Sequence, residues 1–290
     1  MNAQLSERIK SKEKKFSKGQ RLIALYIMEQ YDKAAFMTAS KLGVTVGVSE
    51  STVVRFATEL GYSGYPELQQ AMQEMIRNKL TSVQRLESTY NNYKVDELLE
   101  ASLNQDIDII RKTKDTVDKE EFYSAVNALI KADTIFILGA GSSLALATFL
   151  NHYLRLVFPN VELLDSTSEA EIFQQMVRIG ENDAVIGISF PRYSKRAAKA
   201  LRYASDRGAQ TIAITDTILS PLAQCSKYKL LAKSDMVSFV DSLVGPLSLI
   251  NALIVTIAII KKEDVAKTLA TLEHIWDEYG VYEKIDDRTK

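Results

Sequence analysis

Five short apolar runs in the second half of the chain constrain its fold most. They read 134-TIFILG-139, 161-VELLD-165, 184-AVIGIS-189, 211-TIAIT-215 and 228-YKLLA-232. The runs are rich in Ile and Val, and helical stretches of roughly 12–20 residues separate most of them. This alternation is typical of right-handed βαβ units whose parallel strands are buried on both faces. The sequence therefore predicts a five-stranded, mainly parallel sheet flanked by helices.

The first part of the chain has a helical period instead, from residue 17 to residue 76. Thr38 stands at an N-cap position before one short helix, and Gly47 then interrupts the pattern. Ser49 caps a second helix, 50-ESTVVRFATEL-60. Two short helices joined by a tight turn predict a helix-turn-helix, which lays its second helix in the major groove of DNA.

The second of these helices presents two different faces. Its inward positions at helical spacing are Val53, Phe56, Ala57 and Leu60. The candidate DNA contacts are Lys41, Ser49, Glu50, Ser51, Thr52, Arg55, Tyr62 and Tyr65. Arg55 is the foremost candidate, because a guanidinium can fork onto a guanine edge. Lys41, Tyr62 and Tyr65 are candidates for the DNA backbone, although a three-helix unit with such a turn can also be a plain packing module.

The charge distribution permits nucleic-acid contact at the front of the chain. Residues 1–90 hold 13 Lys and Arg against 9 Asp and Glu, and the remaining residues hold 23 against 28. A mildly basic module therefore precedes an acidic body, although a lysine-rich solvated tail would give the same balance.

The run SESTVVRFATELGYSGYPEL, which begins at Ser49, resembles the signature of the RpiR family of bacterial transcriptional regulators. The similarity covers roughly residues 17–76. It implies that the first domain is a DNA-binding helix-turn-helix.

A glycine-rich turn, 139-GAGSS-143, follows the first apolar run and precedes a helical stretch. Backbone N–H groups and the Ser142 and Ser143 hydroxyls at a helix N-terminus can hold an anion. The third glycine of a dinucleotide fingerprint would fall at Leu144, and no Gly-Lys-Ser/Thr of a Walker loop follows. No nicotinamide or other cofactor is therefore expected.

A second anion-binding candidate, 189-SFPRYSKR-196, also lies between a strand and a helix. Loops at the carboxyl ends of parallel strands converge on one ligand where the strand order reverses. The two turns together resemble the SIS (sugar isomerase) domain, which follows the helix-turn-helix in RpiR regulators and binds phosphosugars. This similarity covers about residues 120–260.

The resemblance implies a set of ligand contacts: Gly141, Ser142, Ser143, Ser189, Arg192, Tyr193, Ser194 and, more weakly, Glu169. This chain departs from the family pattern at two positions, since Pro191 replaces a serine and Arg192 replaces a glycine. Proline removes donors, whereas a guanidinium can pair with phosphate bidentately. Arg192 is either the phosphate ligand or a surface arginine, and Glu169 either touches sugar hydroxyls or only favours its helix start.

The residue inventory argues against several other classes of protein. Cys225 is the single cysteine and there are two histidines, which argues against a disulfide, a thiolate site or a metal site. The longest apolar segment, 249-LINALIVTIAII-260, is expected to be a buried helix and not a membrane span. With no signal peptide visible, a cytoplasmic location is expected.

The organisation expected from these features is a helix-turn-helix domain over 1–80, a helical connector over 81–118 and a SIS domain over 119–290. Leu98, Leu99, Leu103, Ile107 and Ile110 form an apolar stripe on the connector that packs on the next domain or on a partner chain. The function expected is regulation of sugar-gene transcription by a phosphosugar, without catalysis. The partners expected are a palindromic operator and a second copy, as homodimer or tetramer. The alternative is a sugar-phosphate isomerase, for which Glu169, Glu171 and His152 are the loosely placed acid/base groups.

Overall fold

The computed structural model describes residues 3–77, 83, 86–87, 90, 94–234 and 240–282. The chain divides into two compact units, Met1–Arg85 and Leu86–Lys290. Each unit has its own hydrophobic core. The early part of the predicted connector, up to residue 93, lies largely outside the described residues.

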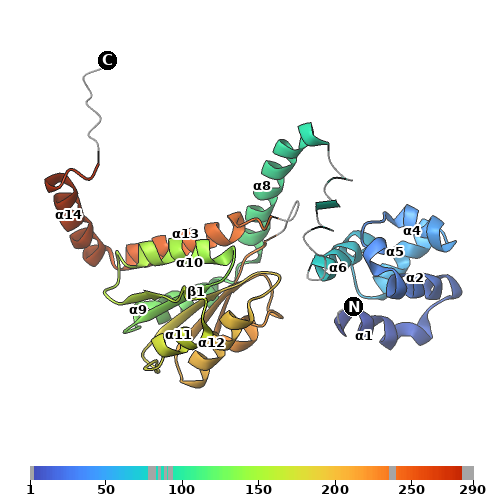
Figure 1. Ribbon diagram of the computed structural model, residues 1–290. Coiled ribbons are helices and arrows are strands. Elements are labelled where there is room, and N and C mark those ends of the chain that lie inside the picture. Colours follow the sequence, from blue (N-terminus) through green and yellow to red (C-terminus); the bar gives the residue numbers. More distant parts are fainter. Residues whose placement is uncertain are drawn as a thin grey trace, which may run out of the picture. The chain divides into compact units, whose positions relative to one another are not determined.

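The first unit is wholly helical in its described part (Figure 1). Its α-helices are α1 (Ala3–Lys12), α2 (Lys18–Glu29), α3 (Tyr31–Ala34), α4 (Ala39–Val46), α5 (Glu50–Glu59) and α6 (Tyr65–Arg77). The four positions expected to face inward from α5 are all buried, namely Val53, Phe56, Ala57 and Leu60. Burial of each large apolar side chain contributes roughly 1.5–3 kcal/mol, so this face fixes the orientation of α5.

In the second unit, helices and strands alternate over residues 119–231. The helices are α8 (Leu98–Thr116), α9 (Lys119–Ile130), α10 (Ser143–Leu154), α11 (Glu169–Gln175), α12 (Lys195–Asp206), α13 (Val244–Ile260) and α14 (Lys262–Glu278). The strands are β1 (Ile135–Gly139), β2 (Val161–Leu163), β3 (Ala184–Ile188), β4 (Gln210–Thr215) and β5 (Tyr228–Leu231). The bounds of each strand differ from those of a predicted apolar run by at most two residues.

The five strands form one sheet in the order β2-β1-β3-β4-β5, and every pairing is parallel. The prediction of a five-stranded, mainly parallel sheet is confirmed. The chain moves from β1 outward to β2 and then crosses back to β3, so the direction of winding reverses between β1 and β3. Gly139 is paired with Ile188 there, which brings the carboxyl ends of β1 and β3 side by side.

Helices cover both faces of this sheet (Figure 1). One face packs against α9, α10 and α13 through alternate strand residues such as Ile137, Ile186 and Ile212. The other face packs against α11 and α12 through Phe136, Val185 and their neighbours. Both faces are therefore buried, as near-continuous apolar strands require.

The stripe predicted on the connector falls on α8 but does not pack within the described part of the chain. Leu99, Leu103, Ile107 and Ile110 are all exposed, and the residues that α8 buries are Ile109 and Thr113. Of the two alternatives, packing on the adjoining domain is wrong for these side chains, because a different face of α8 contacts α13.

Within the described residues, no single helix is long and apolar enough to cross a membrane. Helices α13 and α14 reach that length only together, and they meet at a bend of 98°. The buried residues of α13 include Leu249, Ile250 and Leu253, whereas Val255 and Ile259 are exposed. The segment expected to be a buried helix is thus buried on one face.

Candidate DNA-binding face and anion site

Helices α4 and α5 each begin with a side-chain cap, and a glycine turn joins them. The Thr38 side chain accepts a hydrogen bond from the Lys41 N–H at 3.2 Å, and Ser49 accepts one from the Thr52 N–H at 3.3 Å. Gly47 ends α4 with a φ of 74°, a left-handed conformation that glycine adopts without steric cost. Both caps and the turn at Gly47 lie where the sequence predicted them.

The start of α5 presents polar groups to solvent. Glu50, Ser51 and Arg55 are exposed, and the Nε of Arg55 donates to the Ser51 carbonyl at 3.2 Å. The Ser49 hydroxyl lies 2.9 Å from the Ser51 hydroxyl, and 2.8 Å from the half-buried Thr52 hydroxyl. The face therefore offers hydroxyls and one guanidinium within two helical turns, the groups that read base edges and phosphates.

Sequence reasoning missed Val54 on this same face. Its side chain is exposed beside Arg55, although valine is ordinarily a core residue. An exposed apolar side chain on such a helix can contact a thymine methyl group. The sequence could have indicated this exposure, because Val54 is not one of the positions that helical spacing places on the inward face with Val53 and Phe56.

The two tyrosines assigned to the DNA backbone differ from expectation. Tyr65 is only 2% exposed, and its hydroxyl donates to the carbonyls of Ala34 and Met37. Burial raises the pKa of Tyr65 to about 12. Tyr65 is thus a core residue, and the expectation that it contacts DNA is corrected. Tyr62 is half-buried under the Arg8 guanidinium, 5.2 Å from its ring centroid, whereas Lys41 is exposed.

In the second unit, the two predicted anion turns follow adjacent strands. Residues 139–143 connect β1 to α10, and residues 189–194 connect β3 to α12. Both lie at the carboxyl edge of the sheet, where the winding reverses, because β1 and β3 are neighbours. In doubly wound folds this is the place where ligands bind.

A carboxylate joins the two turns. The Ser142 hydroxyl donates to Oδ2 of Asp241 at 2.9 Å, and the guanidinium Nη2 of Arg192 lies 3.8 Å from the same oxygen. Asp241 comes from the segment that leads into α13, and its side chain is 13% exposed. Sequence reasoning missed Asp241, because nothing in its local pattern shows that it approaches turns that precede it by about 50 and 100 residues.

The backbone conformation at residue 192 explains why the family pattern has glycine at this position. Arg192 has a φ of 71°, and it is the non-glycine residue with positive φ among those described. Glycine adopts this conformation freely, whereas a side chain costs roughly 1–2 kcal/mol there. A residue kept at that cost points to a function for its side chain.

The serines of the second turn bond within the turn itself. The Ser194 N–H donates to the Ser189 hydroxyl at 3.0 Å, and the Ala197 N–H donates to the Ser194 hydroxyl at 3.2 Å. Ser189 and, in the first turn, Ser143 are both buried. The Ser189 hydroxyl thus shapes the loop, and the Ser194 hydroxyl caps α12. The sequence analysis assigned both side chains to the ligand and did not predict these bonds within the protein.

Tyr193 holds the same turn to the end of β4. Its hydroxyl donates to Oδ1 of Asp216 at 2.8 Å, and Thr215 donates to the same oxygen at 3.3 Å. Burial raises the pKa of Asp216, against the lowering by these hydrogen bonds. Burial and the nearby Asp216 charge raise the pKa of Tyr193 well above its ordinary range. The turn is therefore anchored to a second loop of the same edge.

Glu169, the weakest of the expected ligand contacts, has a protein partner. It is exposed and pairs with Nζ of Lys199 on α12 at 2.8 Å. Near the start of α13, the Ser242 hydroxyl donates to Oδ1 of Asp106 on α8 at 2.7 Å. The cap position of α13 is Leu243, without a side-chain cap bond.

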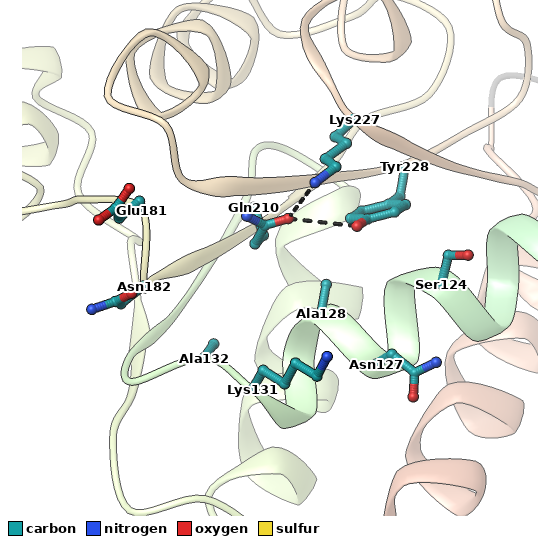
Figure 2. A pocket seen from close by; sticks show the side chains of 10 residues that line it. All are labelled: Ser124, Asn127, Ala128, Lys131, Ala132, Glu181, Asn182, Gln210, Lys227 and Tyr228. Carbon is teal, nitrogen blue, oxygen red and sulfur yellow. Dashed lines mark hydrogen bonds between the residues drawn. The ribbon is translucent and has the colours of Figure 1, made fainter.

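An open cavity of about 470 Å³ lies at the opposite edge of the sheet (Figure 2). Gln210, at the start of β4, accepts hydrogen bonds there from Lys227 at 2.9 Å and from Tyr228 at 3.5 Å. Asn182 and Lys131 also line it. Because it lies at the amino ends of the strands, it is separate from the two anion turns. Among the described residues, no group of three or more His, Cys, Asp or Glu is placed to hold a metal ion.

Two family models match this chain. Residues 3–79 match the helix-turn-helix domain of the rpiR family, and residues 128–256 match the SIS domain. The chain is similar to an HTH-type transcriptional regulator of Clostridium perfringens, with 25% identity over 77% of this chain and 80% of the relative.

Two solved structures share the fold. The sugar isomerase domain of the RpiR transcription factor from Sphaerobacter thermophilus is 28% identical, with a TM-score of 0.59 over 61% of this chain and 99% of that one. NanR of Vibrio vulnificus, complexed with ManNAc-6P, is 22% identical, with a TM-score of 0.57 over 93% of this chain and 98% of that one.

A helix-turn-helix unit followed by a SIS domain defines a DNA-binding transcriptional regulator. With both models matched in this order and regulators among its relatives, the chain belongs to the RpiR family.

Proposed function

We propose that a phosphosugar binds between turns 139–143 and 189–194 and thereby changes the affinity of the helix-turn-helix for its operator. The observation that carries this proposal is the convergence of Ser142 and Arg192 on one carboxylate oxygen. Groups that hold a carboxylate there have the chemistry to hold a phosphate. The complex of NanR with ManNAc-6P, a sugar phosphate on the same fold, supports the class of ligand.

We assign the ligand contacts to Gly141, Ser142, Ser143, Ser189, Arg192, Tyr193 and Ser194, with Arg192 as the phosphate ligand. Glu169 has the weakest case, because Lys199 already neutralises it. On the DNA side we assign Arg55 and Ser51 to base or phosphate contact, and Lys41 to phosphate. The domain limits proposed are 1–80, 81–118 and 119–290.

The regulator is proposed to act as a homodimer, or a tetramer, on a palindromic operator. Leu99, Leu103 and Ile107 leave an apolar stripe exposed on α8, and Val255 and Ile259 do the same on α13. Contiguous exposed apolar side chains of this kind mark an interface. A two-fold dimer matches the two half-sites of a palindrome. Its place of action would be the cytoplasm, with the genome and the sugar-catabolic enzymes.

Regulation is proposed here without catalysis. Aldose–ketose isomerisation requires a base beside the carbonyl carbon. Glu169 is occupied by Lys199, Glu171 is hydrogen-bonded by Ser166, and His152 is exposed on α10 next to Tyr153. The helix-turn-helix would have no role in an isomerase.

The proposal is tested by calorimetry on the full chain with hexose and hexosamine 6-phosphates and their unphosphorylated parents. We expect at least one phosphate ester to bind and its parent to bind at least about 100-fold more weakly. Selection from random DNA gives the operator, and its affinity with and without that ester measures the coupling, of which roughly 5–150-fold is typical. Equal binding of ester and parent would remove phosphate recognition, and turnover of the ester would favour the isomerase.

A further inference from the structure

We infer that Asp241 is an internal anion that occupies the phosphate position until the effector displaces it, and that Ser242 connects this displacement to helix α8. This inference rests on the proposed function of the same site. It adds a residue that competes with the ligand and a route by which the ligand acts.

The geometry around Asp241 is that of a bound anion. One carboxylate oxygen receives the Ser142 hydroxyl at 2.9 Å and faces the Arg192 guanidinium at 3.8 Å. These two groups come from separate turns, and they belong to the set that would hold the phosphate. A phosphate and a carboxylate on the same donors repel each other, so both cannot remain. The arriving phosphate must therefore move Asp241 away.

The neighbour of Asp241 is bonded to a different element. The Ser242 hydroxyl donates to Oδ1 of Asp106 on α8 at 2.7 Å. Successive residues therefore contact the anion turns and α8, and a backbone shift at Asp241 changes the position of Ser242 as well. Helix α8 lies near the start of the second unit, which begins at Leu86, so it is close in sequence to the DNA-binding unit.

The contact of α8 with this region is close, so it transmits small displacements. A Cβ on Gly245 would lie 2.8 Å from Oγ1 of Thr113 and 2.9 Å from Cγ2 of Ile109, both on α8. The same Thr113 hydroxyl accepts the Lys233 N–H at 3.0 Å. Closely packed elements respond to a shift as rigid bodies.

The decisive variant is Asp241→Asn, which keeps the shape and removes the charge. We expect it to bind inorganic phosphate and glucose 6-phosphate at least about tenfold more tightly than wild type, measured by calorimetry on the full chain. The matched control is Asp264→Asn on α14. It removes one carboxylate, whose Oδ2 lies 3.3 Å from Nζ of Lys261. The control should stay within about twofold of wild type. If the Asn variant folds poorly, Asp241→Ser takes its place, and we expect it to bind these phosphates more tightly as well.

The outcomes separate this inference from the proposed function. If wild type binds phosphate esters and both Asp241 variants bind them more weakly or equally, Asp241 is a ligand contact or a bystander and the inference is wrong. If neither wild type nor the variants bind any phosphate compound, the proposed function fails and the inference fails with it.

The connection to α8 is tested by Ser242→Ala. We expect this variant to bind the effector within about threefold of wild type, but to show a smaller change in operator affinity when the effector is added. Fluorescence anisotropy of labelled operator, with and without saturating effector, measures this ratio. A Ser242→Ala protein whose operator affinity responds as fully as wild type would contradict the route through α8.

Discussion

At the scale of single residues, Arg192 has an unfavourable backbone conformation and a side chain that we propose binds an anion. Its left-handed φ of 71° suits glycine, yet its guanidinium faces Asp241 beside Ser142. The sequence shows arginine where the family pattern has glycine, and it left open whether the guanidinium binds an anion or faces solvent. It could not predict the partner, because Asp241 reaches the site only through the tertiary fold.

The backbone cost at Arg192 has a measurable consequence. We expect Arg192→Gly to unfold with a free energy about 0.5–1 kcal/mol higher than Arg192→Ala, because alanine must hold a Cβ in the left-handed region while glycine loses more chain entropy. Urea unfolding of the two variants measures the difference. The reverse order would mean that the left-handed turn is not populated in solution.

Both Arg192 variants should also lose phosphate affinity, by at least about tenfold, since the bidentate pairing is gone. Lys195→Ala is the matched control, because it removes an exposed cation three residues away at the start of α12. Its affinity should stay near that of wild type. An equal loss in Lys195→Ala would point to general charge attraction in place of a specific contact.

At the DNA face, Arg55→Ala is expected to weaken operator binding by about 1–3 kcal/mol and to relax the preference at one base position. Arg111→Ala removes an arginine that is already paired with Asp108 in the second unit, and it serves as the charge-matched control. Anisotropy with the operator and its single-base variants measures both effects. Unchanged affinity in Arg55→Ala would show that α5 is not the reading helix.

At the scale of elements, most of the fold could be predicted from local chemistry. The caps Thr38 and Ser49, the turn at Gly47 and the five apolar runs each act within a few residues of chain, so the sequence carries them directly. The exposed stripe of α8 and the burial of Tyr65 could not be predicted, because both depend on which elements pack together. The same holds for the anchoring of turn 189–194 by Asp216.

That anchor predicts a pH dependence. Burial holds the pKa of Asp216 above its ordinary value of 3.8, so the folded chain binds the proton more tightly than the unfolded chain. Stability from this group is present below the ordinary value and is lost as pH rises through the folded pKa. We expect Asp216→Asn, which still accepts from Tyr193, to lack this loss. Urea unfolding of both proteins from about pH 4 to about pH 8 gives the difference curve, and parallel curves would contradict the prediction.

At the scale of the whole molecule, regulation requires two states that the effector binds unequally, and an assembly that matches the operator. The exposed stripe on α8 is the proposed site of self-association. We expect Ile107→Glu to lower the mass measured by sedimentation velocity to that of one chain, because a charge in an apolar interface stays unpaired.

Val177→Glu is the control for this experiment, since Val177 is also an exposed apolar residue but lies outside α8 and α13. It should leave the mass of the assembly unchanged. If wild type forms an assembly and neither variant dissociates, the interface does not involve the stripe on α8.

The order of the strands also bears on how fast such a regulator responds. The turns after β1 and β3 lead away in opposite directions, while Gly139 and Ile188 remain paired beneath them. A ligand seated between these turns contacts two separate connections, and no strand has to slide when it arrives or leaves. We therefore expect the turns to adjust on the time scale of loop motion, on the order of nanoseconds to microseconds, without any rearrangement of the strands.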